Sequence, residues 1–153
     1  MRLSQAFAFF PAVALVGLAC SDNGVTIPTD LEVYTATLNG ANEAPTPVTT
    51  TATGHATVTI LGNVVTWKVV IDGAIDSIIA GHIHRRAADS VAGNVQVNFA
   101  PPATGVGFKG TATQGSAVPV DSILGIIRAG RSYVNIHTKK NPGGEIRGTL
   151  VKL

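Results

Sequence analysis

Two short, strand-like segments carry the residue types most able to do chemistry: imidazole, carboxylate and guanidinium groups. Side chains two apart on a strand project to the same face, so the two histidines of AGHIH can chelate one ion. A third histidine, in a hairpin predicted over residues 133–150, could complete a three-nitrogen site with an open position, which suits Zn or Cu. The glutamate of that hairpin could orient a ligand from a second layer. The residues are His82, His84, His137, Glu145 and Arg147.

A purely structural role for the same side chains is the alternative. The two histidines of AGHIH would then present only polar edges on a solvated face, while Ile79 and Ile83 pack inward. Glu145 and Arg147 would form a same-face ion pair that contributes less than about 1 kcal/mol. His137 would hydrogen-bond the neighbouring strand and pin the hairpin. His55, on another strand, is assigned no role.

Basic residues follow both histidine segments. If the two strands are neighbours, these residues would form a rim around the histidines that could hold an anionic ligand. The alternative is that they are the solubilising charge of exposed loops. The residues are Arg85, Arg86, Lys139 and Lys140.

The N-terminus indicates export. Arg2 precedes an uncharged apolar run that is too short to span a membrane and that ends in GLAC at Cys20. This pattern predicts a bacterial lipoprotein signal peptide with lipid on Cys20, and an ordinary signal peptide is the alternative. The expected divisions are a signal peptide over 1–19, a lipid-anchored tether over 20–30 and a domain over 31–153. The protein would be a membrane-anchored lipoprotein, facing the periplasm or the cell surface, and otherwise secreted.

Composition excludes several function classes. The net charge of +2 gives no argument for nucleic acid, and contact with a membrane is expected through the N-terminal lipid only. Because the chain has one cysteine, lipid on Cys20 would leave the domain without a disulfide or a thiol nucleophile. No strained serine elbow and no phosphate-cradling glycine loop is present, so the sequence favours a protein that is not an enzyme.

Apolar residues alternate with polar ones along most of the chain, which predicts strands separated by Gly, Pro, Asn and Asp. Gly62 and Asn63 suit a tight hairpin turn, and Trp67 is expected in the core. One helix is expected, with Asp121 or Ser122 as its cap and Gly130 at its end. Roughly seven or eight short strands with one helical insertion predict an all-β, antiparallel β-sandwich.

Three segments together resemble the CHRD domain, a module named from chordin and found in bacterial exported proteins. These are LNGANEAPTPV with the strand over 54–60, then AGHIH, and finally AGRSYVNIHTKKNPGGEIRGTL, which is the most specific. The chain departs from the family where Arg85, Arg86 and Ala87 follow AGHIH, since small residues and glycine are usual there. The resemblance implies an immunoglobulin-like β-sandwich of Greek-key type and an extracytoplasmic setting.

Two functions follow as hypotheses. The first is a non-enzymatic, lipid-anchored binding or structural module of the cell envelope, whose partner is an envelope or extracellular protein or an anionic ligand. The second is a mononuclear Cu or Zn protein, for metal handling or superoxide-dismutase-like redox chemistry, with His82, His84 and His137 as ligands. The spacing of HIH is similar to the HVH of copper/zinc superoxide dismutases, but that family's other ligands are not recognisable here.

Overall fold

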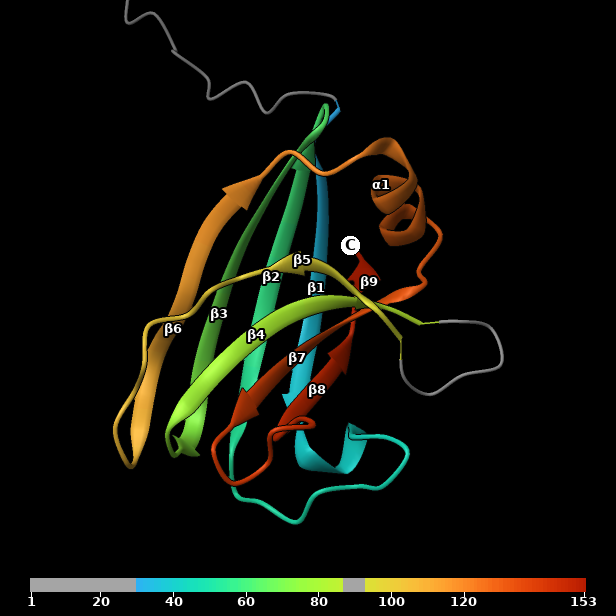
Figure 1. Ribbon diagram of the computed structural model, residues 1–153. Coiled ribbons are helices and arrows are strands. Elements are labelled where there is room, and N and C mark those ends of the chain that lie inside the picture. Colours follow the sequence, from blue (N-terminus) through green and yellow to red (C-terminus); the bar gives the residue numbers. More distant parts are fainter. Residues whose placement is uncertain (1–29, 87–92) are drawn as a thin grey trace, which may run out of the picture.

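The computed structural model describes residues 30–86 and 93–153 (Figure 1). The predicted signal peptide, Cys20 and nearly all of the predicted tether lie outside the described residues. None of the described helices is long and apolar enough to cross a membrane.

Antiparallel strands make up most of the described chain, with one α-helix and one short 3₁₀ turn. The elements are β1 Glu32–Asn39, η1 Gly40–Asn42, β2 Thr53–Leu61, β3 Val64–Ile75, β4 Ile78–Arg85, β5 Val95–Asn98, β6 Phe108–Ala117, α1 Asp121–Arg128, β7 Ser132–Thr138, β8 Ile146–Thr149 and β9 Val151–Lys152. The predicted all-β, antiparallel class with one short helix is confirmed.

The strands form one nine-stranded sheet in the order β5-β4-β7-β8-β1-β2-β3-β6, with β9 paired to β1. Half of the sheet, β5-β4-β7-β8, lies across the core from the other half, β1-β2-β3-β6 (Figure 1). The two halves meet at β8 and β1, whose ladder has one pair, Asn39 with Arg147. At the two ends of the strand order, the Thr113 hydroxyl of β6 donates to the carbonyl of Phe99, which directly follows β5, at 3.2 Å. The sheet therefore nearly closes into a barrel, an arrangement consistent with an all-β sandwich.

The strand count is nine, above the expected seven or eight, because the last predicted strand is two strands. The chain leaves its ladder at Leu150, whose side chain is 1% exposed and whose N–H donates to the carbonyl of Ser132. Beyond this residue β9 pairs with β1. The chain thus changes its pairing partner from β7 to β1 around Leu150.

The β2–β3 hairpin follows its sequence pattern. Gly62 has a φ of +60°, which the tight turn requires and which glycine adopts at little cost. Alternate residues of both strands point into the core, and Trp67, 8% exposed, stacks on Phe99 with ring centroids 5.0 Å apart. The predictions for this turn and for Trp67 are confirmed.

The cap of the helix was predicted wrongly. Val120 is the N-cap residue of α1 and makes no side-chain cap bond, while Asp121 lies in the first turn. A carboxylate there still interacts favourably with the positive end of the helix dipole. Gly130, with a φ of +65°, follows the helix end as predicted.

One residue on β4 faces the opposite way from the prediction. Ile83 is fully buried as expected, but Ile79 is 47% exposed and Ile78 is buried in its place. The cause is a register irregularity in the β4–β7 pairing between Ile78 and Ala80, which inverts the alternation of faces at this end of the strand.

Candidate metal site

The pairing of β4 with β7 brings the three predicted histidines together. Ala80 pairs with His137, and His84 pairs with Tyr133 four residue pairs farther along, so these side chains share one face of the sheet. Ile83 and Ile136 alternate with them and are fully buried in the core. The histidines therefore lie on the outer face of this half of the sheet, opposite the core.

The ligand atoms of His82, His84 and His137 all lie within 4.8 Å of one another. His82 Nδ1 and His137 Nε2 are 3.1 Å apart. Two nitrogens bound to one tetrahedral metal at the usual bond length are about 3.3 Å apart. His82 Nδ1 and His137 Nε2 are thus already at a chelating distance. A pair of ligand nitrogens at the upper limit of 4.8 Å would have to approach by about 1.5 Å.

Backbone carbonyl groups fix the tautomers of two of the rings. His84 Nδ1 lies 2.8 Å from the carbonyl oxygen of Gly93, and His137 Nδ1 lies 3.0 Å from that of Pro142. Carbonyl oxygens only accept, so each Nδ1 carries the proton and each Nε2 keeps its lone pair. Orientation of a histidine through its second nitrogen is the usual arrangement around protein-bound metals.

The lone pair of His84 has no hydrogen-bond partner among the described residues. Its Nε2 atom is buried, and the whole residue is 9% exposed. A buried acceptor without a partner costs about 1–3 kcal/mol, and a water molecule or an ion bound to this lone pair would offset that cost.

All three rings favour the neutral form that metals bind. Burial first, and then the neighbouring His137 and His84, lower the pKa of His82 to about 4. Burial also lowers the pKa values of His84 and His137, although the carbonyl groups of Gly93 and Pro142 oppose this. At neutral pH a metal would therefore bind rings that are already neutral and would release few protons from the cluster.

Tyr133 completes the support of His84, and the sequence analysis missed it. The rings of Tyr133 and His84 are parallel, with an interplanar angle of 4° and centroids 5.0 Å apart, and the Arg147 guanidinium lies 3.5 Å from the Tyr133 centroid. The Tyr133 hydroxyl accepts from the N–H of Gly93, whose carbonyl orients His84. Tyr133 is four residues before His137 on the same strand, so both side chains project to one face of the sheet. This spacing in YVNIH could have identified it.

Glu145 and Arg147 share the histidine face of the β7–β8 pair. Glu145 accepts hydrogen bonds from Thr138 and Asn141 within the β7–β8 turn. Burial would raise the pKa of Glu145, but these bonds and one from Thr50 lower it. Glu145 thus stabilises the turn that presents Pro142 to the histidine cluster.

Glu43 is a second residue that the sequence analysis missed. It is 6% exposed, and its Oε2 accepts from the Asn135 amide at 3.4 Å, while its Oε1 has no partner among the described residues. Burial raises the pKa of Glu43 to about 7, although Arg147 and Asn135 oppose this. Nothing in the polar loop sequence NEAPTPV signals a buried carboxyl group.

The basic residues flank the cluster at opposite ends. Arg85 and Arg86 are exposed where β4 ends, beside Arg131, whose carbonyl accepts from the Arg86 N–H. Lys139 and Lys140 are exposed at the other end of the β4–β7 pair. They do not gather on one side of the histidines.

His55 lies apart from the cluster. It is on β2, exposed, and its Nδ1 is 2.8 Å from the Asp72 carboxylate of β3. It is therefore a natural control for the three clustered histidines.

Comparison with known proteins gives one match. No curated protein and no solved structure matches this chain. The model of the CHRD domain family matches residues 34–150, which include the histidine cluster and nearly the whole described fold. The chain therefore belongs to the CHRD domain family.

Proposed function

We propose that this CHRD domain is a non-enzymatic metal-binding module of the cell envelope, in which His82, His84 and His137 hold one Zn(II) or Cu(II) ion. The observation that carries this proposal is the convergence of three neutral imidazoles within 4.8 Å, one of them with a buried lone pair that has no partner among the described residues. A ligand set of three histidines suits both metals, and copper binds such sites more tightly than zinc.

A purely structural cluster is less consistent with this geometry. Burial of three imidazole rings disfavours their protonated form, which costs stability in acid, and it leaves their hydrogen bonding incomplete. In the metal-free protein His82 Nδ1 donates to His137 Nε2, because the latter has no proton. That contact uses one lone pair and leaves that of His84 unsatisfied. A bound ion would use all three.

The location of the module is proposed from the sequence. A basic start, an apolar run and Cys20 support export followed by lipid attachment, with residues 21–30 as a tether. The module would bind metal, and an envelope partner or anionic ligand with it, outside the cytoplasm.

The test is metal content and thermal stability of the purified chain with Zn(II) or Cu(II). We expect about one ion per chain, and at a free metal concentration 100 times Kd the ion adds about 2.7 kcal/mol of stability, which raises Tm by roughly 10 °C. His82→Ala and His137→Ala should lose both effects. His55→Ala, the matched control, should keep them. Binding that survives in His82→Ala and His137→Ala, or no binding in any form, would refute the proposal.

A further inference from the structure

We propose that one end of the domain rests on the lipid surface of the membrane to which the chain is anchored. This end, the apolar tip, consists of Leu61, Val64, Val118 and Val120. The inference rests on the proposed lipid anchor, and it adds an orientation and a second membrane contact to it.

The apolar tip gathers exposed aliphatic side chains from two connections. Leu61 and Val64 flank the β2–β3 turn and are 42% and 37% exposed. Val118 and Val120 lie between β6 and α1 and are 65% and 67% exposed. The two connections are adjacent because Val65 pairs with Ala117, and Figure 1 shows both at the same end of the sheet. Clustered exposed aliphatics, unlike isolated ones, indicate a contact surface.

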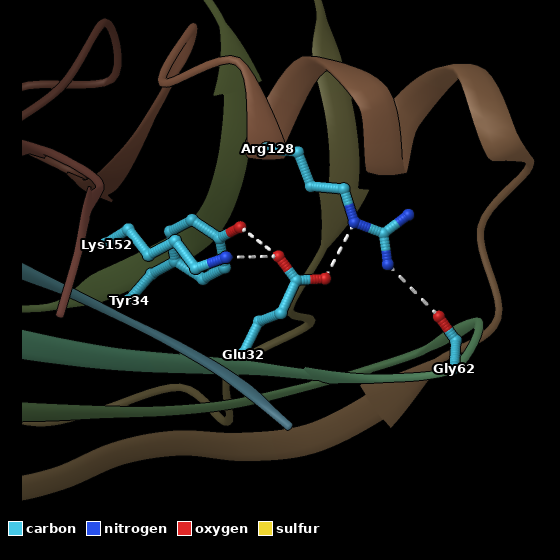
Figure 2. Close-up of polar contacts among 5 residues, drawn as sticks. All are labelled: Glu32, Tyr34, Gly62, Arg128 and Lys152. Carbon is cyan, nitrogen blue, oxygen red and sulfur yellow. Dashed lines mark hydrogen bonds and ion pairs between the residues drawn. The ribbon is translucent and has the colours of Figure 1, made fainter. Parts of the chain in front are cut away.

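A polar cluster behind the apolar tip holds it in place (Figure 2). Arg128 of α1 donates to Glu32 at 2.7 Å and also to the carbonyl of Gly62, in the turn itself, at 3.4 Å. Lys152 of β9 donates to the second carboxylate oxygen of Glu32 at 2.9 Å. These bonds link the β2–β3 turn, α1, the first strand and the last strand. The tip is therefore held in one conformation, and docking would lose little conformational entropy.

The tether enters the domain beside the apolar tip. Glu32, the first residue of β1, pairs with Ile60, immediately before the turn. The ten residues from Ser21 to Asp30 reach at most about 35 Å when fully extended. An anchor at Cys20 would hold the tip within this distance of the lipid and so raise its effective concentration there. A weak apolar contact is then sufficient to orient the domain.

Charge does not supply the contact. Arg128 and Lys152 are paired with Glu32, and two further charged residues of the described chain that lie near the tip, Asp30 and Asp121, are acidic and exposed. An anionic membrane would not attract this surface, so the expected interaction is shallow burial of aliphatic side chains that is insensitive to salt. The histidine cluster, on the outer face of β4 and β7, is not part of the tip.

The experiment uses the full chain, purified from membranes and reconstituted in phosphatidylethanolamine and phosphatidylglycerol vesicles that contain lipids with a quencher on the acyl chain. A fluorophore is placed on Asn63→Cys, at the tip, or on Val106→Cys. Val106 is 84% exposed and lies at the opposite end, near Ile75 and Phe108. We expect about threefold stronger quenching at position 63 than at position 106.

Two further variants test the cause. The double variant Leu61→Asp/Val118→Asp should abolish quenching at position 63. The matched control, Val106→Asp, should leave quenching at position 63 unchanged. Raised salt should also leave it unchanged. Equal quenching at both positions, quenching at neither, or release by salt would overturn the inference and leave the anchor intact. A second label on the chain would show that the thiol of Cys20 is free, which would overturn the anchor and the inference together.

Discussion

Replacement of Glu43 by Gln should stabilise the protein at neutral and alkaline pH and change little in acid. Burial raises the pKa of this carboxyl from 4.5 to about 7. A folded pKa above the unfolded value means that the neutral form favours folding, so its contribution is full below pH 4.5 and is lost as the pH rises through 7. A difference of one unit between the folded and the unfolded pKa corresponds to about 1.4 kcal/mol, so ionisation of Glu43 costs the wild type about 3 kcal/mol at pH 8.

Gln matches the shape of the protonated carboxyl group and does not ionise. The tight approach of Glu43 to Gly144 and Asn135 should therefore be preserved. We expect similar free energies of unfolding at pH 4 and a gain of about 3 kcal/mol for Glu43→Gln at pH 8, because only the wild-type side chain ionises between these two pH values.

Urea unfolding from pH 4 to 8 measures the difference, and fluorescence of Trp67, which is the only tryptophan and lies in the core, reports it. A chelator keeps metal from the histidine cluster. The pKa of His82 falls to about 4, so its contribution has the opposite sign: it is full above pH 6.5 and is lost as the pH falls towards 4. This term is common to both proteins and cancels in the difference. A difference that does not vary with pH, or that is largest at pH 4, would refute the reasoning.

Three other changes test the fold. Ile83→Ala should cost about 2–5 kcal/mol in urea unfolding because the side chain is fully buried, whereas Ile79→Ala on the same strand should cost less than about 0.5 kcal/mol. Gly144→Ala should cost about 2 kcal/mol, because φ is +143° and a Cβ atom would lie 2.6 Å from neighbouring side chains, while Gly143→Ala, which meets nothing, should be neutral. The pKa of Glu32 is lowered to about 2 by Lys152 and then by Arg128, so Glu32→Gln should cost about 1 kcal/mol at pH 7, a difference that thermal scans should show disappearing as the pH falls from 4.5 towards 2. Equal effects within either matched pair, or a pH-independent Glu32 effect, would contradict these assignments.

Local patterns predicted most of the fold because they depend on neighbours in the chain. Alternation placed Val65, Trp67 and Val69 in the core, and Gly62 identified the turn. The errors arose where a long-range contact overrides the local pattern. The register irregularity in β4 turned Ile79 outward, and the pairing of Val151 and Lys152 with β1 divided the last strand.

The candidate site shows the same division. The spacing of His82 and His84 by itself determined that both project to one face, and the YVNIHT and PGGEIRG segments determined the family. Only the tertiary structure decided that β4 pairs with β7, which places His137 beside them, and that the carbonyls of Gly93 and Pro142 set the tautomers. It also decided that Glu43 is buried and has a raised pKa. The physical reason is that strand alternation is a property of consecutive residues, whereas pairing, burial and the pKa shifts they cause depend on segments far apart in the chain.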